Sequence, residues 1–117
     1  MITDNRGDKI LAQARPAGVA AVSAYSPATN RRALISQVVM ANTTALAVAA
    51  YVYVHASGTT FDETTTILFA KAVPANDSIS IDFANYLELE DAGNIGVRHA
   101  TGSAINFTVI GRLQDVL

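Results

Sequence analysis

The sequence has no cysteine and no tryptophan, and few of its side chains are charged. Without cysteine the chain cannot form disulfide bonds, thiolate metal sites or a thiol nucleophile, so its stability has to come from packing. It has 8 Lys and Arg against 10 Asp and Glu, a net charge of −2, and thus lacks the positive excess typical of proteins that bind nucleic acid. We therefore expect no nucleic-acid partner.

Long apolar runs are missing as well. The longest wholly apolar run, residues 45–54, is about half of the roughly twenty residues that a membrane-spanning helix needs. Residues 1–9 are polar and contain no apolar stretch of the kind that a secretory signal has. We therefore expect no membrane partner and no secretion by that route.

Uncharged side chains make up most of the sequence instead. Hydrophobic residues account for 50% of the chain and charged residues for 15%, against roughly 25% charged in an average globular domain. Residues 33–61 contain no Asp, Glu, Lys or Arg. A surface poor in charge suits contact with other protein. The composition predicts a homo-oligomer, with part of residues 33–61 in an interface.

Alternation of apolar and polar side chains predicts strands. In residues 78–83, Ile79, Ile81 and Phe83 alternate with polar side chains, as in a strand with one buried face. Alternation, or β-branched residues between turn signals, predicts strands over residues 10–14, 19–25, 33–41, 44–56, 64–72, 78–83, 95–99 and 105–113, the last with a bulge at Gly111.

Seven or eight short strands in one chain of 117 residues predict a single all-β domain. The expected fold is an antiparallel β-sandwich of the jelly-roll or Greek-key type. Residues 16–117 are expected to form the sandwich and residues 1–15 a flexible N-terminal arm, within which residues 10–14 are an additional strand candidate.

Two pairings between neighbouring strands are also predicted. We expect residues 33–41 to pair with residues 44–56 through a turn at Asn42-Thr43-Thr44, and the C-terminal third to form a hairpin. Alternation within residues 44–56 puts one set of side chains on one face (Leu46, Val48, Val52 and Val54) and another set on the opposite face (Tyr51, Tyr53 and His55).

No group of residues has the spacing of a catalytic or metal site. His55 and His99 lie in separate strands, and we expect both to be partly exposed strand residues. Glu88 and Glu90 alternate with leucines beside Asp91, which favours a solvated strand face over paired acid–base carboxylates. We therefore expect no enzymatic activity, no catalytic residue, no metal and no cofactor.

The basic residues are candidates for contact with a partner. Arg31-Arg32 is the one basic doublet, and either a salt contact to an acidic partner surface or a solvated turn explains it. Arg6, Lys9 and Arg15 lie in the expected arm, where they are available to another subunit. Arg6-Gly7-Asp8 is also the integrin-recognition tripeptide, although so short a match is weak evidence for cell adhesion.

Several segments, taken in order, resemble a known group of proteins. They are residues 35–44 (ISQVVMANTT), 51–54 (YVYV), 73–77 (VPAND) and 93–97 (GNIGV). Together they resemble small β-sandwich virion proteins of tailed bacteriophages, the group of capsid decoration or cement proteins. The resemblance covers about residues 19–111, and it departs from the group's pattern at Asn94, where Asp is more frequent.

The resemblance implies a structural role. Such proteins sit on the outside of the phage capsid as oligomers, often trimers, and stabilise the shell. The implied partners are the major capsid protein and further copies of the chain, and the implied location is the outer capsid surface. Arg6, Lys9, Arg15, Arg31 and Arg32 are then candidates for capsid or subunit contact. Nothing catalytic carries over.

A binding module is the alternative. A carbohydrate- or receptor-binding sandwich of a phage tail or head fibre would use exposed aromatic rings to stack on sugar faces. The candidates are Tyr51, Tyr53, Tyr86 and Phe61, although all four also fit ordinary strand or core positions. Tryptophan, a frequent sugar platform, is absent.

Overall fold

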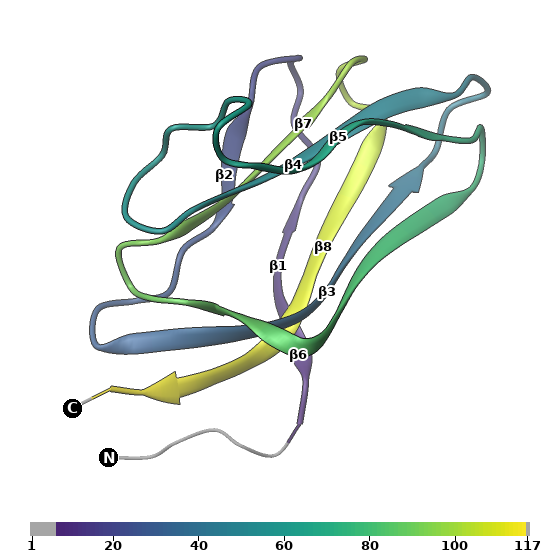
Figure 1. The fold of residues 1–117 in the computed structure, drawn as a ribbon. Coiled ribbons are helices and arrows are strands. Elements are labelled where there is room, and N and C mark those ends of the chain that lie inside the picture. Colours follow the sequence, from purple (N-terminus) through teal and green to yellow (C-terminus); the bar gives the residue numbers. More distant parts are fainter. Residues whose placement is uncertain (1–6, 117) are drawn as a thin grey trace.

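The computed structural model describes residues 7–116, which form two β-sheets that face each other (Figure 1). The strands are β1 (Lys9–Ala14), β2 (Val22–Tyr25), β3 (Arg31–Asn42), β4 (Val48–His55), β5 (Thr66–Val73), β6 (Ser78–Leu89), β7 (Asn94–His99) and β8 (Ile105–Asp115). No helix of the length and hydrophobicity that a membrane crossing requires occurs in this part of the chain.

The strand order confirms the all-β sandwich that the sequence predicts. One sheet has the order β1-β8-β3-β6 and the other the order β2-β7-β4-β5, and all recorded pairings are antiparallel. The chain changes sheet after most strands, so that strands distant in sequence become neighbours. This is the strand order of a jelly roll, in which two Greek keys build a double sheet.

The two predicted hairpins are wrong. β3 and β4 lie in different sheets, and so do β7 and β8. The segments between these strands cross from one sheet to the other instead of turning back within a sheet. Alternation shows which face of a strand is buried, but it does not say which strand lies beside it.

The N-terminal strand belongs to the sandwich. β1 pairs with β8 from Lys9 opposite Gly111 to Ala14 opposite Phe107. Residues 9–14, which the sequence places in the expected arm, are therefore an edge strand of the β1-β8-β3-β6 sheet. The part of the expected arm before Gly7, including Arg6, lies outside the described residues.

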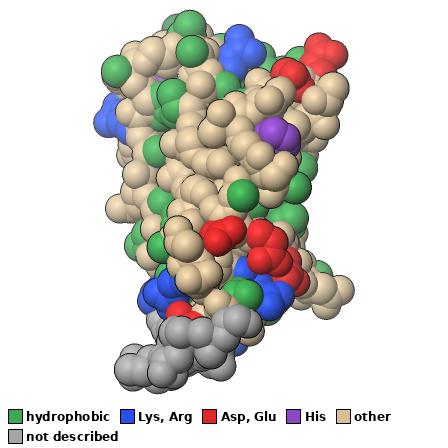
Figure 2. Space-filling model, turned by 90° about the vertical axis from the view of Figure 1, so that its left-hand side faces the viewer, with side chains coloured by type: hydrophobic (Ala, Val, Ile, Leu, Met, Phe, Trp, Pro, Cys, Tyr) green, Lys and Arg blue, Asp and Glu red, His purple; other side chains and the backbone are tan. Residues whose placement is uncertain are grey.

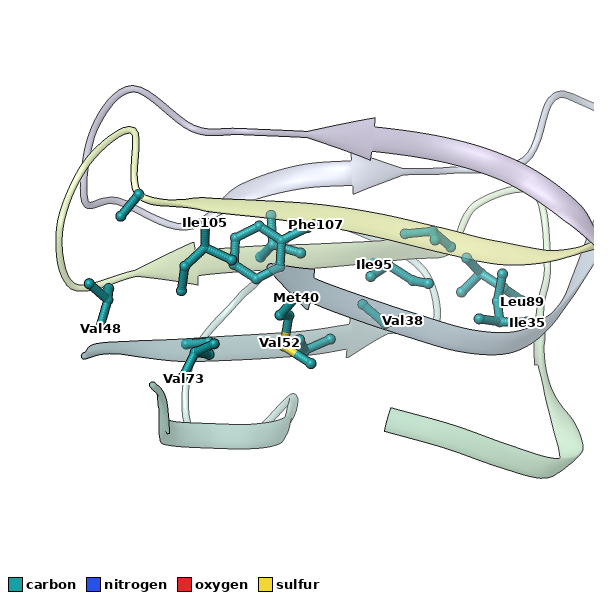
Figure 3. Packing of buried hydrophobic residues seen from close by; sticks show 14 of the residues in the cluster. Ile35, Val38, Met40, Val48, Val52, Val73, Leu89, Ile95, Ile105 and Phe107 are labelled. Atoms are coloured by element: carbon teal, nitrogen blue, oxygen red, sulfur yellow. The ribbon is translucent and has the colours of Figure 1, made fainter. Parts of the chain in front are cut away.

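The hydrophobic core lies between the inner faces of the two sheets. Figure 3 shows Phe107 from β8, Met40 and Val38 from β3, and Val52 from β4 packed into this space. Phe107, Met40, Val38 and Val52 are all 0% exposed. Because the chain has no disulfide bond, this burial is the main source of its stability.

β4 follows the predicted alternation except at its start and at Tyr53, which is 2% exposed although it lies on the outer face. Val48 and Val52 are buried in the core, whereas Tyr51 and His55 are only half-buried. Alternation groups Leu46 with these two valines, but Leu46 is 76% exposed. It lies outside the sheet because β4 begins only at Val48.

The predicted irregularity near Gly111 is present, with the extra residue on the facing strand. Ile35 pairs with Gly111 and Gln37 with Ile110, so Ser36 of β3 is the bulged residue. A Cβ atom on Gly111 would lie 2.2 Å from the carbonyl oxygen of Leu34. Only glycine permits this close approach of the two backbones.

Asn42 holds the crossing between β3 and β4. Its side chain is 2% exposed and has all its hydrogen-bonding capacity in use. Its Nδ2 donates to the carbonyl oxygens of Leu46 (2.9 Å) and Val73 (3.0 Å), and its Oδ1 accepts from the amide (2.9 Å) and hydroxyl (2.8 Å) of Thr44. One buried amide thus ties the crossing segment to the end of β5.

We predict that Asn42→Ala lowers the free energy of unfolding by about 1–3 kcal/mol, because it leaves the buried Val73 carbonyl without its donor. The exposed Asn85→Ala is the matched control and should change stability by less than about 0.5 kcal/mol. Urea unfolding followed by circular dichroism measures both. Equal effects of the two substitutions would contradict this role of Asn42.

Candidate interaction surface

Four aromatic rings form a row across the outer face of the β2-β7-β4-β5 sheet. The aromatic row consists of Phe61, Tyr53, Tyr51 and Phe69. Tyr53 and Tyr51 are stacked with 6.4 Å between ring centroids, and Phe69 meets Tyr51 edge-on at 5.2 Å. Phe61 lies 6.0 Å from Tyr53 at the other end. The two tyrosines lie on the face that alternation predicts, two residues apart on β4.

One end of the aromatic row is an internal contact. Phe61 lies in the β4–β5 loop and covers Gly96 of β7, where a Cβ atom would be 2.5 Å from Cδ1 of the phenylalanine. Tyr53, beside it, is only 2% exposed. Phe61 and Tyr53 therefore hold the loop on the sheet and offer little surface to a ligand.

The other end of the aromatic row is open. Phe69 is 54% exposed, and the Arg98 guanidinium carbon lies 4.4 Å from the centroid of the Tyr51 ring. β5 has one more residue than β4 between the pairs Ala50 with Lys71 and Val52 with Leu68, and Ala70 in this bulge has a φ of 53°. Such a φ is strained for alanine. The bulge directs an apolar ring toward solvent.

We predict that Gly96→Ala lowers the free energy of unfolding by about 1–3 kcal/mol, because its methyl group displaces the Phe61 ring. In a Phe61→Ala background the same change should cost far less, since the space is then empty. Denaturant unfolding of the four proteins of this double-mutant cycle gives the coupling energy. Additive effects would show that Phe61 does not pack on Gly96.

The β4–β5 loop is closed by short-range hydrogen bonds around Asp62. Its carboxylate accepts from the hydroxyl (2.5 Å) and the amide (2.8 Å) of Thr64, and the Thr60 amide donates to Nδ1 of His55 (3.2 Å). The Thr64 hydroxyl, then the Thr64 amide, holds the pKa of Asp62 below its usual value, and His55 lowers it further. Because the folded-state pKa is lowered, this stabilisation is present near neutral pH and is lost as the pH falls through that pKa.

We predict that Thr64→Val raises the pKa of Asp62 part of the way toward about 3.9, the usual value, because the amide donor remains when the hydroxyl is removed. A titration of the Asp62 carboxyl carbon by NMR measures the shift, with Asp82 as an internal reference. An unchanged pKa would exclude the hydroxyl as the main cause.

The basic doublet begins β3 and is paired within the chain. Arg31 forms an ion pair with Asp115 at 3.1 Å, and Arg32 forms one with Glu88. Both therefore lie on a strand and not in a solvated turn. Figure 2 shows a face where uncharged atoms predominate, with red and blue side chains beside each other near its lower end. Contact of these arginines with a partner stays a prediction.

A second charged group holds the start of β1. The guanidinium of Arg112 donates to Asp8 (3.2 Å) and to the Tyr86 hydroxyl (2.7 Å), and the hydrogen bond to Asp8 raises the pKa of Arg112. The sequence groups Tyr86 with Tyr51 and Tyr53 as a sugar-stacking candidate. Tyr86 lies on β6, however, and so belongs to the opposite sheet from the aromatic row. The Asp8 carboxylate of the Arg-Gly-Asp tripeptide is bound to its own chain.

His99 is buried, which corrects the prediction that it is partly exposed. It is 0% exposed, its Nδ1 accepts from the amide of Ile105 (3.2 Å), and its Nε2 is 2.8 Å from the carbonyl oxygen of Pro16. This pattern assigns the proton to Nε2. Arg15, which lies next to Pro16 in the β1–β2 connection, donates to the carbonyl oxygen of Ser103 between β7 and β8. Both side chains fasten the β1–β2 connection to the end of the sandwich.

The remaining candidates stay separate from one another. Glu88 and Glu90 are exposed, as alternation predicts, while Leu89 between them is 1% exposed. His55 is half-buried on the other sheet. Lys9 is exposed at the start of β1. Within residues 7–116, no three His, Asp or Glu side chains gather in a way that could hold a metal ion.

Comparison with known proteins does not identify a function for this surface. No protein-family model matches the chain, and no curated protein matches it. Among solved structures, the chain is similar to one in the structure of infectious bursal disease virus, Gx strain, with a TM-score of 0.39 and 12% sequence identity. The matched region covers 98% of this chain and 41% of the viral chain.

Proposed function

We propose that this chain is a structural virion protein of the capsid decoration, or cement, kind. It assembles with further copies of itself, as a trimer by the resemblance, and binds the major capsid protein on the outer surface of a phage capsid. The observation that carries the proposal is a β-sandwich with few charged residues and with several large apolar side chains on its surface. The proposal gives the chain no catalytic role.

The exposed apolar side chains support contact with protein. Leu46, Ile10, Phe69 and Val19 are each more than half exposed, at 76%, 58%, 54% and 51%. They occupy different parts of the molecule, since Leu46 and Val19 precede β4 and β2, Ile10 lies on β1 and Phe69 on β5. A protein that touches several neighbours at once would bury them in separate contacts, and many modest contacts together give tight attachment.

The internal pairing of charges supports the same proposal. The arginines at one end of the sandwich are neutralised by acidic side chains of their own chain. Interfaces between proteins are depleted in charge at their centres. The jelly roll itself serves viral capsids, lectins and cupins alike, so the fold does not decide among these functions.

The proposal predicts binding to capsids. Capsids of the virus that encodes the chain, assembled without it, would be mixed with the purified full chain and imaged by cryo-electron microscopy. The expected result is added density at regular positions on the outer surface. Leu46→Asp and Ile10→Asp should each weaken binding by about tenfold if these side chains are in contact, with Glu90→Gln as the control. Absence of the chain from such particles would contradict the proposal.

Carbohydrate or receptor binding is the second candidate, and the open end of the aromatic row favours it. Phe69 and Tyr51, with the Arg98 guanidinium beside them, form an exposed aromatic surface that could stack on a sugar. Tyr53 and Phe61 are occupied by the loop contact, which leaves fewer rings than the sequence suggests. A glycan array with wild type and Phe69→Ala separates the candidates, because a specific signal lost in the variant would favour this one.

A further inference from the structure

Lys71 and Glu63 stand apart from the other charged side chains. Arg31, Arg32 and Arg112 form ion pairs within the chain, and the remaining described arginines donate to backbone carbonyls. The side chains of Lys71 and Glu63 have no hydrogen bond or ion pair among residues 7–116, and both residues are exposed. An oppositely charged pair is therefore left without partners.

These two charges lie at opposite ends of one edge strand. β5 is the outer strand of the β2-β7-β4-β5 sheet. Glu63 lies in the turn just before it, closed by a hydrogen bond from the Thr65 amide to the Asp62 carbonyl (3.1 Å), and Lys71 lies near its end. The exposed apolar side chains between them are Ile67 and Phe69, 43% and 54% exposed. An exposed apolar edge strand invites pairing with another chain.

The order of charges along β5 is self-complementary. A contact around a two-fold axis brings the same surface of two copies together, so that residue i of one meets residue j of the other and the reverse. If two β5 strands lie antiparallel, the Glu63 end of each meets the Lys71 end of the other, and the apolar middles face each other. A parallel arrangement would instead place like charges side by side.

We infer that β5 is the edge through which two copies of this chain associate. The copies lie antiparallel around a two-fold axis, with Ile67 and Phe69 at the centre and Lys71 of each copy facing Glu63 of the other. The bulge at Phe69 and Ala70 interrupts the strand, so side chains make most of the contact. This two-fold contact is separate from the three-fold contact that a trimer needs. The inference therefore rests only on the self-association of the chain in the proposed function, and it needs no capsid.

Charge reversal tests the inference. One edge strand with its flanking side chains is small beside the roughly 800 Å² per partner of a standard interface, so association should depend on concentration. Sedimentation velocity of the full chain from micromolar to near-millimolar concentration should show a monomer–dimer equilibrium. Lys71→Glu and Glu63→Lys should each weaken it by about tenfold, and the double variant should restore most of it. Glu90→Lys, at the exposed residue that follows β6 of the other sheet, is the control and should have no effect.

Other outcomes overturn the inference. Lysine on an edge strand can also keep edges apart, and in that case Lys71→Thr would raise the mass instead of lowering it. A monomer at every concentration, or an oligomer that neither reversal changes, would also exclude β5 as the contact. Dimerisation through β5 without capsid binding would count against the proposed virion role alone. The β5 contact and the virion role can therefore fail separately.

Discussion

The burial of one face of each sheet is the constraint on which the rest of this structure depends. The chain has no cysteine and hence no disulfide bond, so the packing of the two inner faces holds the sheets together. The jelly-roll order makes the chain cross between the sheets repeatedly, and each crossing takes backbone polar groups past the core. Among residues 7–116, Asn42 and His99 are the buried polar residues, and both hold such segments by hydrogen bonds to backbone atoms.

The outer surface consists of uncharged side chains with a few charged ones among them. Acidic side chains neutralise the arginines near the start of β3 and at Arg112, which limits long-range attraction and fixes the ends of the strands. The β2-β7-β4-β5 sheet presents aromatic and apolar side chains on its outer face and edge. The strained bulge at Ala70 and the open end of the aromatic row lie on the same strand as the unpaired Lys71, so three separate features meet at β5.

Sequence alternation predicted which segments are strands because period two follows directly from strand geometry. Residues 78–83 are the clearest case, since the polar side chains of that segment are exposed and the apolar ones partly buried. Strand partners were not predictable in the same way, because the crossings after β3 and β7 have turn-like sequences that fit a hairpin equally well. The strand at Lys9–Ala14 has no clear alternation, so the sequence predicts it only as an additional strand within the expected arm.

Among the candidate site residues, too, local spacing predicts the environment of some and not of others. Exposure of Glu88 and Glu90 follows from spacing alone, whereas the burial of His99 depends on a connection, at Pro16, far away in the sequence. Phe61 covers Tyr53 from a loop that no periodicity describes. Gly96, inside an otherwise apolar strand, was the available signal, because a glycine in a strand often marks close approach of another group.

The central claim is that the β5 edge and the adjoining outer face are buried when copies assemble. Amide hydrogen exchange of the full chain, compared between dilute and concentrated solution, tests this claim most directly. The account predicts slower exchange for residues 66–73 at high concentration and unchanged exchange in β1, the edge of the other sheet. Unchanged exchange in β5, with new protection confined to the β1-β8-β3-β6 sheet, would contradict it.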